Sequence, residues 1–381
     1  MDLPLTASSS TPSTRKPNVA IAFSSGAGGG GGLLDAASSV ASAVGVELSG
    51  DAVDPWQRSL VEIISESRLA PAVDQLKLQI AQDSQSPDYN IEDEGDVQLG
   101  YEDDQLYPVF TGFITQIQRS LLNFATITVC NASYLLAQMR INESFEQQSA
   151  GDIVESLAGT AGVETDTVEP GIDFPFYVVD DGKNLYQHIA ELAAKSGLYA
   201  YIGGDGKLNF ASPPSGEAIK TFVYGVDILA IKTARSKNKV DQISAVGQGA
   251  AGSQGAEAWD WLVKDPQPVS ASAGSGNNTR VISDHSLRSS EAAQQAAASK
   301  TFLMKQQANK LNITVVGAPE VLAGNRVAIS EVPDDLFNGA GIVESVRHQY
   351  SKQMGFITDL VLLMESEDNS LDLLGGLGGL L

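Results

Sequence analysis

The sequence has 381 residues, of which 43% are hydrophobic, and this length is enough for two or three domains with buried cores. Asp and Glu number 47 against 24 Lys and Arg, so the net charge is −23 and we expect neither specific nucleic-acid binding nor direct membrane insertion. The single cysteine, Cys130, excludes an intrachain disulfide and a cysteine-based zinc site, and we expect it to be buried on a strand.

The N-terminal region combines a polar segment, one strand and a glycine run. Residues 1–16 are rich in Ser, Thr and Pro, which predicts disorder. A strand is expected from residue 17, and the Gly-rich stretch 24–50 is expected to be an insertion within the first β module. The apolar run Val19–Phe23 is too short for the core of a secretion signal, so we expect synthesis and assembly in the cytoplasm.

The glycine run also matches a dinucleotide-binding pattern. Gly26, Gly28 and Gly31 have the G-x-G-x-x-G spacing after a predicted strand, and Glu47 follows at the distance of a ribose-binding acid. A nucleotide-binding enzyme is therefore one alternative function. We favour a flexible loop, because a glycine homopolymer matches this pattern by accident and no further βαβ units follow.

A strand unit that occurs twice is the main signal in this chain. Gly95 leads into a strand, an acidic loop and a second strand at Gly112; Gly324 leads into the same series, ending at Gly341. The marker glycines are equally far apart in both copies. Alternating residues, as in Val73–Gln82, indicate antiparallel strands with one solvated face. One chain therefore carries two similar β modules.

Between the two copies, the hydrophobic period changes to that of helices. A capping box at Ser149–Asp152 starts one helix, and a second is expected over 184–196, where Gly197 ends it. A hairpin is expected over 198–210. These elements predict a small α+β insert, residues 141–212.

The complete fold prediction is mainly β (α+β). Two antiparallel β-barrel modules, 17–140 and 213–365, flank the insert, and the second contains a long loop over 249–276 and a helix over 289–310. A Leu/Gly-rich tail, residues 366–381, follows the second module.

No motif predicts a catalytic, cofactor or metal site. Asp88–Asp96 resembles the start of a calcium loop, but position six is Asp93 instead of glycine and position twelve is Leu99 instead of glutamate. The histidines share no metal-binding spacing: His188, His285 and His348. We therefore expect a protein that is not an enzyme and needs no cofactor.

The C-terminal tail is the segment that we expect to contact a partner. Its leucines are interrupted by glycines, so they cannot form a stable helix alone, and exposed leucines favour burial. They are Leu371, Leu373, Leu374, Leu377, Leu380 and Leu381. Partner docking, packing on the chain's own body and disorder are the three alternatives.

In the order and spacing of several of these stretches, the chain resembles the phage late control protein D family. The matching segments are Gly95–Asp104 with Pro108–Gly112, Phe145–Val163, Tyr177–Asp180 with the helix to Gly197-Leu198-Tyr199, and Gly206–Phe210. The resemblance extends over residues 60–365. It implies two barrel modules related to tail-tube subunits, with the α+β insert between them.

The resemblance also implies a function. Members of that family are homotrimeric baseplate hubs of contractile tails and injection systems, in which paired modules form a pseudo-sixfold ring between the sixfold inner tube and the threefold spike. The implied partners are a separate spike protein, an inner-tube or tube-initiator protein, and baseplate wedge and tape-measure proteins. The chain would thus end in a virion or extracellular particle. A free-standing adhesin or binding module with duplicated β domains is the second alternative, and it predicts a monomer.

Overall fold

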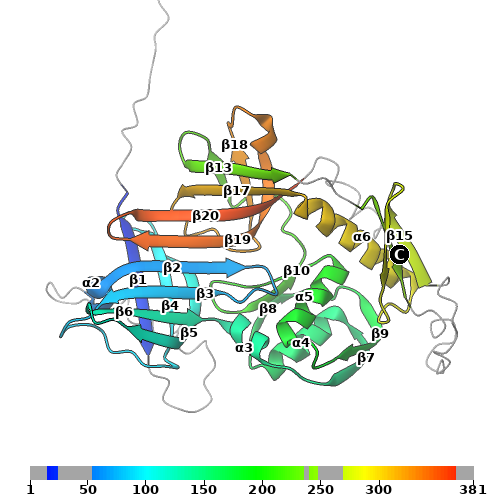
Figure 1. Ribbon diagram of the computed structural model, residues 1–381, viewed down its shortest axis with the longest axis horizontal. Coiled ribbons are helices and arrows are strands. Elements are labelled where there is room, and N and C mark those ends of the chain that lie inside the picture. Colours follow the sequence, from blue (N-terminus) through cyan, green and yellow to red (C-terminus); the bar gives the residue numbers. More distant parts are fainter. Residues whose placement is uncertain (1–14, 25–53, 236–239, 248–268, 366–381) are drawn as a thin grey trace, which may run out of the picture.

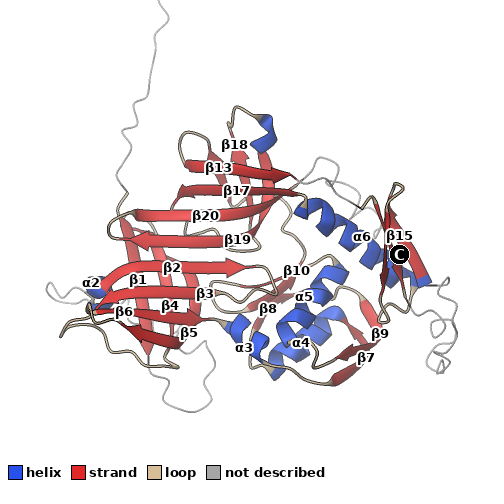
Figure 2. Cartoon of the chain, viewed as in Figure 1, coloured by secondary structure: helices blue, strands red, loops and turns tan. Residues whose placement is uncertain are grey.

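The computed structural model of the protein describes residues 15–24, 54–235, 240–247 and 269–365. It is mainly β, as predicted, and is built around one 12-stranded sheet (Figures 1 and 2). The glycine run, most of the expected loop 249–276 and the tail 366–381 lie outside the described residues.

Six strands form the first half-sheet, in the order β1-β4-β5-β6-β3-β2. They are β1 (Pro17–Ser24), β2 (Leu60–Arg68), β3 (Gln75–Ala81), β4 (Glu94–Tyr101), β5 (Tyr107–Arg119) and β6 (Phe124–Cys130). The alternation predicted for β3 is confirmed, since Leu76, Leu78 and Ile80 are fully buried. The short helix α2 (Pro55–Ser59), capped by Asp54, places Trp56 in the same apolar cluster.

The second half-sheet repeats this topology. It contains β12 (Lys220–Val223), β13 (Ile228–Arg235), β17 (Asn309–Val316), β18 (Arg326–Ser330), β19 (Gly339–Ser351) and β20 (Gly355–Met364). Their order is β12-β18-β19-β20-β17-β13, so each strand takes the place of its counterpart in chain order. A bulge follows Gly112 at Thr115 and follows Gly341 at Glu344. The repeat predicted from the sequence is therefore confirmed in strand order, and in register where β5 pairs with β6 and β19 pairs with β20.

The marker glycines of the two first strands, however, play different roles. Gly95 lies inside β4 and pairs directly with Gly112. Gly324 precedes β18 and adopts a left-handed φ of +85°, and Gly341 pairs with Val327 instead. Equal spacing of the glycines in the sequence thus does not correspond to equal pairing in the sheet.

The two half-sheets are joined into one sheet by β2 and β19, which pair from Arg68–Ser345 to Glu62–Ser351. Each half curves around its own apolar cluster. Among the described strands, neither half closes on itself by pairing its two end strands. In Figure 1, β1 and β4 cross the stacked strands β2, β3, β19 and β20 at a steep angle.

The insert between the half-sheets is an α+β unit at one end of the stacked strands (Figure 1). Its elements are α3 (Ala132–Gln138), β7 (Glu143–Ser149), α4 (Ala150–Thr160), β8 (Thr165–Val168), β9 (Asp173–Val179), α5 (Leu185–Ser196), β10 (Tyr199–Ile202) and β11 (Leu208–Ala211). The predicted capping box is confirmed, because the Ser149 and Asp152 side chains each accept the other residue's backbone N–H. Gly197 ends α5 at a φ of +76°, as expected.

A further unit, which we call the satellite, interrupts the second half-sheet between β13 and β17. It consists of β14 (Gln242–Val246), β15 (Ser270–Gly274), β16 (Thr279–Ser283) and α6 (Ser290–Gln307). Part of the expected loop 249–276 is therefore a strand, β15. The helix predicted over 289–310 ends at Gln307, and β17 begins at Asn309.

The satellite packs against the insert, although the sequence assigns it to the second module. Ala293 and Ala297 of α6 are fully buried in the same apolar cluster as Ile189 and Leu192 of α5. A helix rich in alanine carries a weak amphipathic signal, so its period predicts a helix but not which core receives it. The predicted second module 213–365 thus contains a segment that belongs to the core of the insert.

Candidate assembly surfaces

The large sheet carries unpaired strand edges. In the described part of the chain, β1 pairs only with β4, and β13 pairs only with β17. β5 pairs with β4 along Tyr107–Phe113 and with β6 along Phe113–Arg119, so the end of β5 has a partner on one side only. Such edges present backbone N–H and C=O groups to another chain.

Large apolar side chains are exposed beside β13. Val226 is 73% exposed, Leu229 is 58% exposed and Val316 is 43% exposed. The backbone N–H of Val316 donates to the carbonyl of Asp227, which brings these residues together at the sheet edge. An apolar rim on an unpaired strand is typical of a protein–protein contact.

A hollow of about 370 Å³ lies on the sheet where the two half-sheets meet. Its charged lining residues are Glu66, Arg68, Lys232, Arg347 and Asp359. Arg68 and Arg347 both pair with Glu66, at 2.8 Å and 3.4 Å. The hollow therefore has a nearly balanced charge, in contrast to the acidic chain as a whole.

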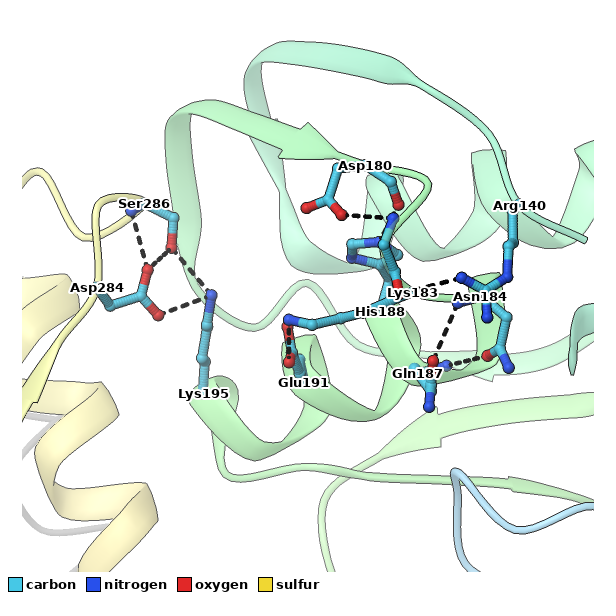
Figure 3. A network of polar contacts seen from close by, with 11 residues as sticks. Arg140, Asp180, Lys183, Asn184, Gln187, His188, Glu191, Lys195, Asp284 and Ser286 are labelled. Carbon is cyan, nitrogen blue, oxygen red and sulfur yellow. Dashed lines mark hydrogen bonds and ion pairs between the residues drawn. The ribbon is translucent and has the colours of Figure 1, made fainter.

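A groove of about 630 Å³ separates α5 and β9 of the insert from the segment between β16 and α6 (Figure 3). Lys195 of α5 spans it: its Nζ lies 2.8 Å from Asp284 Oδ2 and donates to Ser286 Oγ at 3.0 Å. The same Nζ lies 5.2 Å from the centre of the Tyr177 ring. Burial alone would raise the pKa of Asp284, but the charge and hydrogen bond of Lys195 hold it below its ordinary value. This contact links the insert to the satellite.

Of the other basic residues that line the groove, Lys183 pairs with Glu191, whereas Arg288 and Lys300 have no carboxylate partner among the described residues. The guanidinium of Arg288 lies 5.7 Å from the Phe176 ring, and its Nε is buried without an acceptor. Lys300 of α6 lines the same groove. His188 binds the carbonyl of Asp180 through Nε2 at 3.0 Å, whereas its buried Nδ1 has no partner. Cations above an aromatic floor suit a ligand that combines a carboxylate with an apolar group.

A buried polar network ties the first half-sheet to the insert. Asp74, which precedes β3, accepts hydrogen bonds from the backbone N–H of Arg68 at 2.8 Å and from Asn131 Nδ2 at 2.9 Å. Asn131 caps α3, and Ser133 donates to Asn131 Oδ1 and accepts from the backbone N–H of Asp74. Burial raises the pKa of Asp74 to about 7, and these hydrogen bonds limit the rise.

A second buried titratable group lies in the second half-sheet. His348 of β19 is 1% exposed; its Nε2 lies 3.0 Å from the carbonyl of Val321, and its Nδ1 lies 3.0 Å from Thr358 Oγ1. Because a carbonyl only accepts, Nε2 carries the proton and Nδ1 accepts from the Thr358 hydroxyl. Burial lowers the pKa of His348 to about 4, so the ring is neutral.

The residues singled out in the sequence are mostly not gathered into one site. The six tail leucines and the Gly26–Gly31 pattern lie outside the described residues. Cys130 is buried, and burial raises its pKa. Of the histidines, His188 and His285 line the same groove, which their separation in the sequence does not predict. Within the described ranges, no group of three His, Cys, Asp or Glu side chains could hold a metal ion.

The groups that join the units were missed by sequence reasoning. Asn131 precedes a helix in a typical N-cap position, so the cap itself could have been recognised. Its contact with Asp74 has no local signal, because the two residues are 57 positions apart. The contact between Lys195 and Asp284 likewise depends on the packing of the satellite against the insert.

Comparisons with known proteins agree with this architecture. The sequence profile of the Alg8 N-terminal domain matches residues 76–352. The chain superimposes with a TM-score of 0.61 and 14% identity on the 43 kDa tail protein of prophage MuSo2 from Shewanella oneidensis, covering 80% of this chain and 94% of that one. A tail protein from Neisseria meningitidis MC58 gives 0.61 and 14%, covering 81% and 93%.

A third similar structure is the E. coli c3393 protein, described as a component of the type VI secretion system that resembles the T4 tail proteins gp27 and gp5. Its TM-score is 0.55 at 11% identity, with coverage of 81% of this chain and 74% of that one. No curated protein sequence matches the chain. Among the described helices, none has the length and apolar character needed to span a membrane.

Proposed function

The chain belongs to the Alg8 N-terminal domain family, and we propose that it is a structural subunit of a phage-like contractile tail or injection particle. The proposal is supported by a fold shared over 80% of the chain with a prophage tail protein and over 81% with a second tail protein. It is also supported by the similar fold of a type VI secretion component. In this role the chain acts through its surfaces, not through catalysis.

Within the particle, we propose that the chain is a baseplate hub of the late control protein D type. The observation that carries this proposal is the repeated strand order of the two half-sheets in one chain. A homotrimer would place six similar half-sheets around one axis, and its symmetry would remain threefold. Such a ring can contact a sixfold inner tube on one side and a threefold spike on the other.

The proposed partners follow from that position. The ring would contact an inner-tube or tube-initiator protein on one face and the spike protein on the other, with wedge and tape-measure proteins nearby. The leucines between Leu371 and Leu381 would dock on the spike, which buries their apolar side chains. The chain would be incorporated into a virion or an extracellular particle.

Light scattering of the purified full-length chain tests the proposed hub. A mass three times that of the monomer is expected; a stable monomer would favour a free-standing adhesin or binding module. Cryo-electron microscopy of the particle then places the chain: density on the axis between tube and spike is expected, and density elsewhere contradicts the hub. A chain truncated after Glu365 is expected to remain trimeric but to lose co-purification with the spike. Retained spike binding would exclude the leucine tail as the link.

A further inference from the structure

The joint between the two half-sheets uses one strand from each copy of the repeat. In chain order, β2 is the second strand of the first half-sheet. It pairs with β19, which in chain order is the fifth strand of the second half-sheet. Among the described strands, their counterparts β13 and the end of β5 each have a partner on one side only, as do β1 and β12. Figure 1 shows β13 and β5 at opposite limits of the stacked strands.

We propose that β13 of one chain pairs antiparallel with the end of β5 in a second copy of this chain, repeating the β2–β19 joint between molecules. This inference rests on the proposed trimer and specifies its interface. If each joint repeats the one before it, three chains form a ring of six half-sheets with no unpaired β13 or β5 edge. The interface is heterologous, as a closed ring requires.

The corresponding residues of β19 and β5 can be identified from the repeat. His348 follows Gly341 by as many residues as Arg119 follows Gly112, and each segment contains the same bulge. The cross-strand pairs repeat the same pattern, because β5 pairs with β6 from Phe113–Cys130 to Arg119–Ala125 and β19 pairs with β20 from Ile342–Leu363 to His348–Thr358.

The corresponding residues of β2 and β13 follow in the same way. Ser65 of β2 pairs with Leu76, and Thr233 of β13 pairs with Leu311. Leu76 and Leu311 in turn occupy the same place, since they pair with equivalent residues of β6 and β20. Within the chain, His348 pairs with Ser65. The intermolecular joint therefore pairs Arg119 with Thr233 of the next copy.

Exposure at the two edges agrees with a joint that a single chain leaves open. Ser65 and His348 are each 1% exposed at the formed joint, where Val321 and Thr358 also cover the His348 ring. By contrast, Arg119 is exposed and Thr233 is half-buried. Beyond Arg119, the β5–β6 turn presents Leu121 and Leu122 at 102% and 78% exposure.

These leucines have a place in the proposed joint. Counted from the marker glycines, Leu121 takes the place of Tyr350, which pairs with Ile63. Because β5 ends at Arg119, Leu121 would lie just beyond the paired residues, beside Ile231 of the next copy. Turn residues are normally polar. A leucine that is fully exposed in a turn buries no apolar surface in the monomer, so it does not stabilise the monomer. Burial against the neighbouring β13 and its exposed Leu229 gives both leucines a function.

Disulfide trapping tests the register. In a Cys130→Ala background, Arg119→Cys with Thr233→Cys should give covalent dimers and trimers on mild oxidation, because directly opposed residues in an antiparallel pair approach closely. The matched control is Gln118→Cys with Thr233→Cys, whose side chains point to opposite faces and should not cross-link. A trimer by light scattering without the first cross-link, or with equal cross-linking of the control, overturns the joint but leaves the proposed hub intact. A monomer contradicts both.

The leucine turn gives an independent test. Leu121→Ser with Leu122→Ser should weaken trimer association by about 100-fold, measured by dilution in sedimentation experiments. Met354→Ser is the matched control, because Met354 is 66% exposed at the equivalent turn of the second half-sheet, beside β2 of its own chain. Its trimer affinity should be unchanged. Equal weakening by both variants, or by neither, contradicts the proposed interface, as does binding of the wild-type turn to phosphatidylglycerol vesicles in place of a second copy.

Discussion

The first and second half-sheets share their strand order but differ in what their loops carry. β2 and β3 are joined by a tight turn, Leu69–Asp74, whereas the corresponding strands β13 and β17 are separated by the whole satellite. The sheet pairing survives this difference, because the satellite leaves both strands at their places and packs on the insert. A duplicated sheet thus tolerates a large insertion where it changes a loop and not a pairing edge.

The half-sheets also differ at their outer strands. β1 runs antiparallel to β4, whereas β12 runs parallel to β18. The proposed intermolecular joint uses neither β1 nor β12. The joint within the chain is formed by β2 and β19, whose counterparts are β13 and β5. These counterparts pair with their neighbours β17 and β6 in the same register as β2 and β19 pair with theirs. The two half-sheets are therefore most alike in the strands that the proposed intermolecular joint would use.

The largest expected effect concerns the buried titratable groups, one beside each half-sheet. Asp74 has its pKa raised to about 7, so its contribution to the stability of the fold is complete below pH 4 and is lost as the pH rises to 7. His348 has its pKa lowered to about 4, so its contribution is complete above pH 6.5 and is lost as the pH falls to 4. The two effects have opposite signs over the same pH range, so they oppose each other in the wild type.

Two variants separate these opposing effects. With His348→Gln, the free energy of unfolding in urea should decrease from pH 4 to 7, because the titration of Asp74 is no longer opposed by that of His348. With Asp74→Asn it should increase over the same range. The other carboxylates contribute equally to the slope of unfolding free energy against pH in both variants, so subtracting one slope from the other removes their contribution. Equal slopes in the two variants would show that Asp74 and His348 do not have opposite effects on the pH dependence of stability.

Much of this architecture could be predicted from local signals. The alternation of β3, the capping box at Ser149 and the stop at Gly197 each depend on a few neighbouring residues, and the repeat depends on their recurrence. The joint between β2 and β19 could not be predicted in the same way. Its register depends on how two curved half-sheets meet, and neither strand's own pattern specifies its neighbour on that side.

The candidate surfaces were still less predictable. Arg288 and Lys195 are ordinary basic residues in the sequence, and they acquire a role only because the satellite lies across the groove from α5. Exposure of Leu121 and Leu122 could be suspected from a turn between two alternating strands. Their relation to β13 required the strand order of both half-sheets.

The next effect in size compares equivalent glycines. A Cβ on Gly112 would lie 2.2 Å from the carbonyl oxygen of Cys130, which is backbone and cannot move aside. A Cβ on Gly341 would lie 3.0 Å from the carbonyl of Leu363 and 3.1 Å from the flexible side chain of Met364. Gly112→Ala should therefore cost about 3 kcal/mol of unfolding free energy and Gly341→Ala about 1 kcal/mol. Equal losses in urea unfolding would mean that the two half-sheets pack alike at this position.

The smallest effect tests whether the satellite, which interrupts only the second half-sheet, is held by the insert. Lys195 and Asp284 have side chains 18% and 21% exposed, and Lys195→Met should cost about 1.5 kcal/mol because it leaves a half-buried carboxylate unpaired. Lys183→Met is the matched control: its pair with Glu191 is 43% and 40% exposed, so a loss of about 0.3 kcal/mol is expected. Amide hydrogen exchange should then quicken in α6 and β16 for the first variant only. Faster exchange in β17 and β13 in place of α6 would instead assign the satellite to the second half-sheet, as its position in the chain suggests.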